Sequence, residues 1–281
     1  MATIDIRGVQ HTYELTQRTA SPHVLVFVHG WMLSRHYWQP LVNQLQGQYQ
    51  CLWYDLRGFG ESQLGCSAYS DYSPAAYAED LVTLLHKLEI SHAWLVGHSL
   101  GGTIVLWAAA QDPQVVKGIV CMNSGGGIDL KEEFERFRQA GRQLVKFRPR
   151  WLSHWPVVDF LFMRAQVCRP LSREWGHQRL VDFLVADQEA ALRTLLDSTT
   201  EAEVHQLPQI VSRLSQPVYF LTGAEDQVMA PKYVHHLASF HWGFQGAGEN
   251  VIEIPQTGHL AMVEQVDIVA THLQGILASQ S

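Results

Sequence analysis

Short, mainly apolar runs of strand length recur along the chain and alternate with segments that carry apolar residues at helical spacing. The runs lie at residues 24–28, 50–54, 92–96, 115–122, 217–223 and 250–254. Runs without a regular polar face are typical of strands that helices cover on both sides, as in a parallel sheet. Helical patterns follow at residues 73–89, 103–110, from 231, and from 260 to 278. The alternation predicts an α/β fold with a mostly parallel central sheet and helices on both faces.

The first strands and the first long helix carry their own local signals. Residues 3–16 predict one or two short strands around a turn at Gly8, which would form an antiparallel edge of the sheet. The helix over residues 73–89 begins with Ser73 as its cap and Pro74 in its first turn. Its apolar residues share one face that we expect to pack on the sheet: Tyr77, Leu81, Leu84, Leu85 and Leu88.

The alternation stops between residues 128 and 213, where strand signals are weak and helical patterns prevail. We interpret residues 128–213 as an inserted helical cap, or lid, and residues 1–127 with 214–281 as the α/β core. The cap is rich in aromatic residues: Phe134, Phe137, Phe147, Trp151, Trp155, Phe160, Phe162, Trp175 and Phe183. Collectively they suit a hydrophobic substrate or docking surface, although any single ring is better explained by the cap's own small core.

Arginines also gather in this insertion. They are Arg136, Arg138, Arg142, Arg148 and Arg150. We interpret them as a solvated helix face, with recognition of an anionic substrate group or of anionic lipid headgroups as the alternative.

Composition narrows the class of protein. The 281 residues, 47% of them apolar, can bury one large core, so a single domain with an insertion is expected. A net charge of -7 gives no broad basic field, which argues against nucleic acid as a partner. The four cysteines, Cys51, Cys66, Cys121 and Cys168, lack paired metal-ligand spacing and suit a reducing compartment.

Targeting signals are also missing. The N-terminal residues lack the apolar stretch of a signal peptide, and no run of about 18 apolar residues is present to span a bilayer. We therefore expect a cytoplasmic protein with a small-molecule substrate. Attachment to a membrane surface and the oligomeric state stay open.

The strongest chemical signal is the turn Gly97-His98-Ser99-Leu100-Gly101, between an apolar strand and an apolar helix. Only a sharp turn can join them, and glycines on both sides of Ser99 relieve the crowding that such a turn creates. A Gly-x-Ser-x-Gly turn in this context is a nucleophile elbow, which presents a hydroxyl at the carboxyl edge of the sheet, above a helix N-terminus. A strand-to-helix turn without chemistry is the alternative interpretation.

Two loops follow earlier strands at the same predicted edge. In His29-Gly30-Trp31, the amide of Trp31 would form an oxyanion hole together with the amide of Leu100. We expect His29 to brace its loop by hydrogen bonding rather than to act as a base. In the Gly-punctuated loop after residue 54, we expect Asp55 and Arg57 to form an ion pair within the loop, not a metal or phosphate site.

Two further residues complete a candidate catalytic triad. Asp226 follows the strand over 217–223, and His259 follows the last strand, directly after Gly258. His259 would take the proton of Ser99 during attack on a carbonyl carbon, and Asp226 would orient the imidazole. His98 borders Ser99, but we assign it no chemical role because its side chain would point away.

The chain resembles the α/β-hydrolase superfamily over nearly its whole length outside the cap. The motifs that carry the resemblance are His29-Gly30-Trp31, residues 55–62 (DLRGFGES), Gly97-His98-Ser99-Leu100-Gly101-Gly102, Gly223-Ala224-Glu225-Asp226 and Gly258-His259. Together they are specific for the fold and much less specific for the substrate. The resemblance implies a sheet of about eight strands, catalysis without a metal or organic cofactor, and usually ester hydrolysis. A serine at the elbow argues against dehalogenases and epoxide hydrolases, which use an aspartate there.

Several activities within this superfamily remain open. Hydrolysis of carboxylic esters with a hydrophobic moiety, through an acyl-enzyme on Ser99, is the leading hypothesis. The chain is also similar to 2-succinyl-6-hydroxy-2,4-cyclohexadiene-1-carboxylate synthases, lyases that eliminate pyruvate with the same triad acting as a base. That family usually has tyrosine before the serine and arginine on the following helix, where this chain has His98 and Thr103. Further alternatives are esterases that remove phytol from chlorophyll or pheophytin, and a binding protein on a hydrolase scaffold.

Overall fold

A computed structural model of the chain describes residues 1–65, 71–125, 131–148, 163–164 and 166–280. Its centre is an eight-stranded sheet in the order β1-β2-β4-β3-β5-β6-β7-β8. The strands are β1 (Ala2–Ile6), β2 (Val9–Leu15), β3 (Val24–Val28), β4 (Gln50–Tyr54), β5 (Ala93–His98), β6 (Val116–Met122), β7 (Val218–Gly223) and β8 (Val251–Ile254). The strands expected from the apolar runs are confirmed, with bounds that differ by one or two residues.

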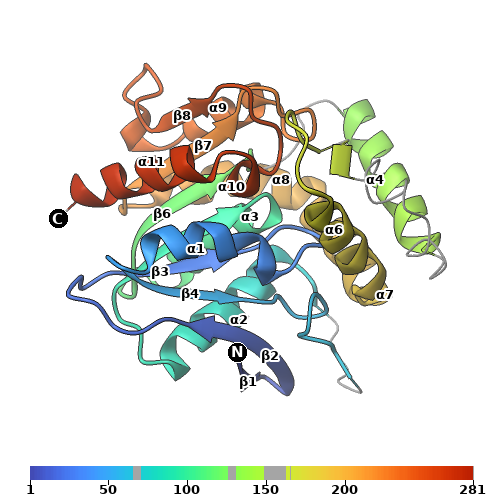
Figure 1. Cartoon of the computed structure of the whole chain (residues 1–281). Helices are drawn as coiled ribbons and strands as arrows, with labels where there is room; N and C mark the ends of the chain where they lie inside the picture. The colour runs from blue at the N-terminus through green and yellow to red at the C-terminus, as the bar shows by residue number, and fades with distance from the viewer. Residues whose placement is uncertain (66–70, 126–130, 149–162, 165, 281) are drawn as a thin grey trace.

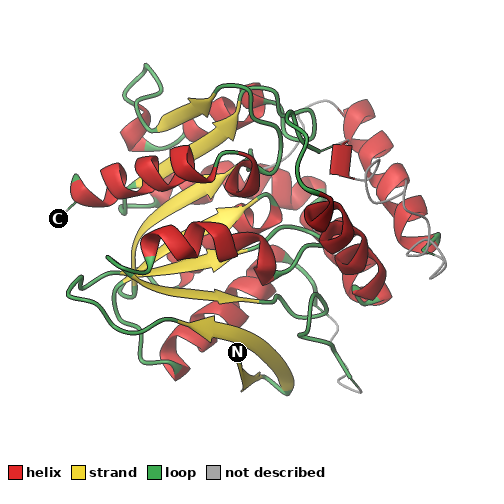
Figure 2. Cartoon of the chain, in the orientation of Figure 1, coloured by secondary structure: helices red, strands yellow, loops and turns green. Residues whose placement is uncertain are grey.

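The sheet is parallel except at one edge. The β1–β2 hairpin turns at Arg7 and Gly8, which both have positive φ, and β2 pairs antiparallel with β4. Strands β4, β3, β5, β6, β7 and β8 are parallel, so in Figure 2 their arrows point the same way. Gly97 of β5 lies opposite Val28 of β3 and Cys121 of β6. The carboxyl ends of the central strands therefore open at one edge.

Helices cover both faces of the sheet, as predicted. One face packs against α1 (Gln39–Leu45), α10 (Ala261–Glu264) and α11 (Val266–Ala278), and the other against α2 (Pro74–Lys87), α3 (Leu100–Gln111), α8 (Glu201–Arg213) and α9 (Pro231–Ala238). Alternate residues of β3 serve the two layers: Leu25 and Phe27 face the first, Val26 and Val28 the second. The expected single C-terminal helix is wrong, because the extended φ of Gln265 separates α10 from α11.

The described residues between 131 and 213, which lie between β6 and β7 along the chain, are mostly helical, and we call residues 131–213 the helical segment. Besides α8 it contains α4 (Lys131–Lys146), α6 (Arg173–Val185) and α7 (Gln188–Ser198). Figure 1 shows α4, α6 and α7 beyond the carboxyl ends of the strands. The amide of Asp187 donates to the carbonyl of Gly58 (2.8 Å), and a Cβ on Gly58 would lie 2.3 Å from the Cβ of Ala190. Glycine at position 58 thus lets α7 approach the loop after β4.

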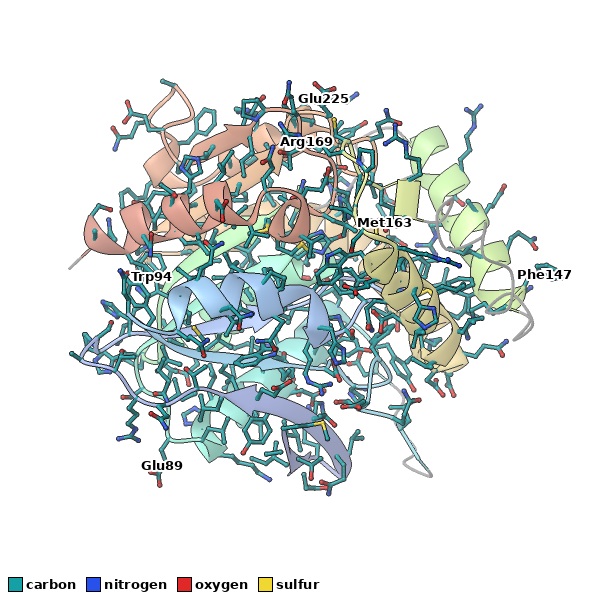
Figure 3. All side chains as sticks on the ribbon, in the orientation of Figure 1. Glu89, Trp94, Phe147, Met163, Arg169 and Glu225 are labelled. Atoms are coloured by element: carbon teal, nitrogen blue, oxygen red, sulfur yellow. The ribbon has the colours of Figure 1, made fainter. Side chains whose placement is uncertain are left out.

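The aromatic residues of the helical segment divide among different surroundings. Phe183 is buried in the core, and the ring of Trp175 lies 5.4 Å from that of Tyr37. Phe147 is 71% exposed and lies at the outer edge of the molecule beside α4 in Figure 3. Phe183 and Trp175 thus pack inward, whereas Phe147 belongs to no small core. Four others lie outside the described residues: Trp151, Trp155, Phe160 and Phe162.

The arginines of the helical segment also lie in different surroundings. Arg138 donates to the carbonyls of Leu196 and Thr199 at the end of α7, and Arg148 to those of Phe183 (3.0 Å) and Ala186 (2.8 Å) at the end of α6. Cations in these places satisfy carbonyls that lack an intrahelical partner. The solvated-face interpretation is therefore wrong for Arg138 and Arg148. It agrees with the exposure of Arg136 and Arg142, and Arg150 lies outside the described residues.

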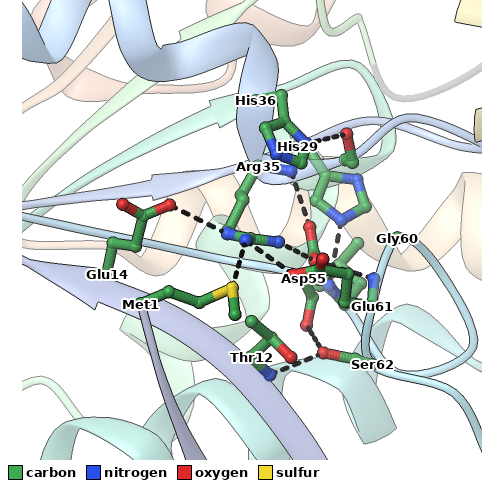
Figure 4. A network of polar contacts seen from close by, with 12 residues as sticks. Met1, Thr12, Glu14, His29, Arg35, His36, Asp55, Gly60, Glu61 and Ser62 are labelled. Carbon is green, nitrogen blue, oxygen red and sulfur yellow. Dashed lines mark hydrogen bonds and ion pairs between the residues drawn. The ribbon is translucent and has the colours of Figure 1, made fainter. Parts of the chain in front are cut away.

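The expected ion pair between Asp55 and Arg57 is also wrong. Asp55 binds Arg35, through Nη1 at 2.5 Å and through the backbone amide at 2.7 Å (Figure 4). Arg57 instead binds the buried Asp80, with Nε 2.8 Å from Oδ2. Each charge is buried, so it pairs with a partner that the fold brings close rather than with its neighbour in sequence.

Candidate functional site

Ser99 occupies the turn between β5 and α3. Its φ of 51° and ψ of -117° are far from the backbone angles of ordinary L-residues, and α3 begins at the next residue. A Cβ on Gly97 would lie 2.2 Å from the carbonyl oxygen of Gly101, and a Cβ on Gly101 would lie 2.2 Å from that of Val28. Only glycine fits at both positions, and this close packing holds the serine in its strained conformation.

Asp226 and His259 are in direct contact, although they come from loops after different strands. Nδ1 of His259 lies 2.8 Å from Oδ2 of Asp226, and both side chains are buried. Oδ1 of Asp226 accepts from the amides of Val228 (2.8 Å) and Met229 (2.9 Å). Burial alone would raise the pKa of the Asp226 carboxyl, but His259 and these donors lower it. Asp226 is thus held as an anion that orients the imidazole.

Asn123 also contacts the carboxylate of Asp226. Its Nδ2 donates to Oδ2 of Asp226 (2.8 Å) and to the carbonyl of Gly258 (3.1 Å). The sequence analysis gave Asn123 no role. One signal was present, since an asparagine directly after a central strand faces the same edge as the candidate triad and tolerates the positive φ of 50° found here.

Ser99 follows directly on a residue whose ring packs against that of His259. The ring of His98, the residue before Ser99, lies 4.8 Å from the ring of His259 between centroids. Among the described residues, no hydrogen bond joins the hydroxyl of Ser99 to the imidazole of His259. In enzymes without substrate this bond is often long and tightens only when substrate binds.

His98 has a structural contact that the sequence analysis missed. Its Nε2 donates to the carbonyl of His259 (2.7 Å), so the ring supports the backbone of the histidine loop. Burial, followed by the proximity of His259, lowers the pKa of His98 to about 3. His98 therefore stays neutral at physiological pH and places no positive charge next to His259.

The loop after β3 lies against Ser99, since a Cβ on Gly30 would be 3.2 Å from the serine Cβ. The carbonyl of Gly30 accepts from Nδ1 of His29 (2.8 Å) and from the amide of Leu33 (3.2 Å). In a trans peptide the C=O and the next N–H point in opposite directions, so these bonds also fix the amide of Trp31. His29 accepts from the amide of Leu56 through Nε2 (2.9 Å), which confirms its bracing role.

Helix α6 is docked on the same loop. The hydroxyl of Ser34 donates to Oδ2 of Asp182 (3.0 Å), and Nε2 of Gln178 donates to Oδ1 (2.9 Å). Burial raises the pKa of Asp182 from 3.8 to about 7, and the charge of Asp55 adds to the rise. The donors Ser34 and Gln178 and the charge of Arg179 oppose it without cancelling it.

Asp182 makes stability depend on pH, and we expect Asp182→Asn to remove that contribution. In the unfolded chain the carboxyl returns to its ordinary pKa of 3.8, so the folded protein binds more protons up to about pH 7. The stabilisation is complete below about pH 4 and is lost as the pH rises through about 7. Urea unfolding across this range should show a smaller loss for Asp182→Asn than for the wild type. The exposed Glu174, replaced by glutamine, is the control and should follow the wild type; equal slopes for Asp182→Asn would contradict the assignment.

Other kinds of site are not evident in the described part of the chain. It contains no group of three or more histidine, cysteine, aspartate or glutamate side chains arranged to bind a metal ion. It also has no helix with the length and apolar character needed to cross a bilayer. Cys51 and Cys121 are buried free thiols, and Cys168 is partly buried.

Comparisons with known proteins identify the family of the chain. Residues 23–266 match the family described as alpha/beta hydrolase fold. The chain is 24% identical to the uncharacterized hydrolase YugF of Bacillus subtilis, over 96% of this chain and 94% of the relative. It is 28% identical to 2-succinyl-6-hydroxy-2,4-cyclohexadiene-1-carboxylate synthase of Salmonella typhimurium, over 77% and 82% of the two chains.

Solved structures show the same fold. An esterase from Thermogutta terrifontis superimposes with a TM-score of 0.81 at 21% identity and covers 99% of both chains. An esterase from Exiguobacterium antarcticum superimposes with a TM-score of 0.78 at 17% identity and covers 98% of both. With the family match extending over most of its length, the chain belongs to the α/β-hydrolase superfamily of enzymes.

Proposed function

We propose that this enzyme hydrolyses carboxylic esters, with Ser99 as the nucleophile, His259 as the general base and Asp226 as the residue that orients it. The observation that supports the proposal is the contact between His259 and the buried Asp226, next to His98, which directly precedes the strained Ser99 at the start of α3. A serine hydroxyl is a weak nucleophile, so attack on a carbonyl requires such a base within reach. We propose the helical segment, residues 128–213 by the sequence boundaries, as the cap over this site.

The chemistry proceeds in two halves. His259 takes the proton of the Ser99 hydroxyl as the oxygen attacks the ester carbonyl, and then gives this proton to the departing alcohol. Water next attacks the acyl-enzyme and loses a proton to His259. The acid then leaves, and the hydroxyl of Ser99 is restored. Asp226 stabilises the imidazolium without taking its proton.

The amides of Trp31 and Leu100 are our candidates for the oxyanion hole. Leu100 is the first residue of α3, so its N–H has no partner within the helix. The amide of Trp31 is fixed by the two hydrogen bonds to the Gly30 carbonyl. Each donor of this kind stabilises the transition state by about 3 kcal/mol.

A hydrophobic acyl or alcohol group fits the residues around the candidate triad. Trp31 and Met229 are partly buried, Leu100 is buried, and all three adjoin residues of the proposed site. Apolar side chains with few polar groups among them are typical of sites that bind a hydrophobic small molecule.

Pyruvate elimination is the second candidate, because relatives that carry the synthase name are 28% identical to this chain. That reaction acts on a substrate with several carboxylates, which calls for cations near the site. Arg138 and Arg148 are instead bound to the C-terminal carbonyls of α7 and α6. These contacts occupy two of the arginines that the sequence suggested for an anionic substrate group.

A fluorophosphonate and two substrates test the proposal. We expect the purified enzyme to react with the fluorophosphonate, with the mass increase located on the Ser99 peptide, and to turn over p-nitrophenyl butyrate and octanoate. Absence of both labelling and ester turnover in the folded protein would overturn the ester hydrolase. Release of pyruvate from the succinyl-cyclohexadiene precursor, with p-nitrophenyl esters left intact, would instead establish the lyase.

A further inference from the structure

Arg179 of α6 is a buried cation that the proposed mechanism does not use. Its side chain lies at 2% relative exposure. Nη1 donates to the carbonyl of Met32 (2.9 Å), and Nε donates to Oε1 of Gln166 (3.0 Å). Burial lowers the pKa of Arg179, which reflects the cost of keeping the charged guanidinium away from water. Burial of this kind is tolerated where the hydrogen bonds are well formed.

Two acceptors of Arg179, the Met32 carbonyl and the Gln166 side chain, connect it to the two loops of the proposed site. Met32 follows Trp31, whose amide is a candidate oxyanion donor. Met32 is itself fully buried with a φ of 54°, a conformation that a non-glycine residue keeps only when its surroundings hold it. The bond from Arg179 to the Met32 carbonyl is one such constraint.

The second acceptor, Gln166, also contacts His259. The backbone carbonyl of Gln166, whose side chain binds Arg179, accepts from the amide of His259 (2.8 Å). Glu264 also joins these two segments. Its Oε1 accepts from the amide of Gly258 (3.0 Å), and its Oε2 accepts from the amide of Cys168 (2.7 Å). Gln166 and Cys168 are thereby fixed to the loop that carries His259.

We propose that Arg179 is a positioning residue, which holds the loop of Trp31 and the loop of His259 in their relative places. The proposal rests on the function proposed above, because the two loops matter together only if Trp31 and His259 act on one substrate. The planar guanidinium suits this task, since it presents two N–H groups in fixed directions to two acceptors. Lysine offers a single flexible ammonium and cannot reproduce that geometry.

Chemical rescue tests the proposal. We expect Arg179→Ala to lower kcat for p-nitrophenyl butyrate by about 10- to 100-fold with KM changed much less, because small misplacements of catalytic groups act mainly on the transition state. Added methylguanidinium should restore a large part of kcat. Arg148→Ala is the matched control, because Arg148 also donates to backbone carbonyls of α6 but contacts neither loop. A folded Arg179→Ala enzyme with wild-type kcat, or one that methylguanidinium leaves unchanged, would overturn the proposal.

Hydrogen exchange gives a second readout that needs no turnover. In Arg179→Lys, which preserves the charge, amides of residues 30–34 and 257–260 should exchange faster than in the wild type, while those of β3 and β5 stay unchanged. Unchanged exchange in both loops would overturn the positioning role. A wild type that turns over no ester, with faster exchange in the lysine variant, would overturn the proposed function alone.

Discussion

Replacing Ser99 by alanine is expected to reduce ester turnover by about 10⁴-fold or more, because the reaction loses the atom that forms the acyl-enzyme. Alanine fits the backbone at this position as well as serine does, and the amide of residue 99 still donates to the carbonyl of Met122. The folded structure should therefore persist. Hydrolysis of p-nitrophenyl butyrate, followed in parallel with fluorophosphonate labelling, measures the effect.

A surface serine provides the control for this experiment. Ser91 is exposed, and its hydroxyl lies 3.0 Å from Nδ1 of the neighbouring His92. Ser91→Ala should match the wild type in turnover and labelling. If Ser99→Ala kept more than about a tenth of wild-type kcat while Ser91→Ala behaved normally, another group would have to be the nucleophile.

Replacing Asp226 by asparagine is expected to lower kcat by about 10⁴-fold, while the fold is retained. The oxygen of the new amide can still accept from the amides of Val228 and Met229. Its NH₂ group would then face Nδ1 of His259 and Nδ2 of Asn123, where the carboxylate now accepts. Two donors cannot satisfy each other, so His259 would adopt the other tautomer or turn away and lose its function as a base.

A control at Glu225 distinguishes loss of the Asp226 carboxylate from a general loss of negative charge. Glu225 is exposed, and Glu225→Gln removes the same charge one residue away. We expect the Glu225→Gln variant to retain the kcat and the unfolding midpoint of the wild type. A fall in kcat of less than tenfold for Asp226→Asn would mean that His259 needs no carboxylate partner.

Local signals made most of the fold and the proposed triad predictable. The apolar runs placed the parallel strands, because all of them except the edge strand β8 are largely buried. Ser99, Asp226 and His259 were predictable because each follows a strand whose carboxyl end faces the same edge. For Ser99 the glycines that relieve the turn lie in the sequence itself, at positions 97 and 101.

Contacts between distant segments were not predictable in the same way. Asp55 binds Arg35, 20 residues earlier, rather than Arg57, because the helical turn after β3 brings Arg35 to the carboxylate. The same holds for Arg138 and Arg148, whose acceptors are carbonyls at the ends of other helices. A sequence shows that an arginine is present but not which carbonyl needs a donor after folding.

The carbonyl that Gln166 offers to His259 limits how this enzyme can be recombined with its relatives. A chimera that exchanged the whole of residues 131–213 would also replace the peptide that holds the backbone of His259, so the exchange would displace that histidine. Crossovers at Asp187, the capping residue of α7, leave Gln166 and Arg179 with their parental loops. Libraries that vary α7 alone are therefore the safer route to altered substrate range.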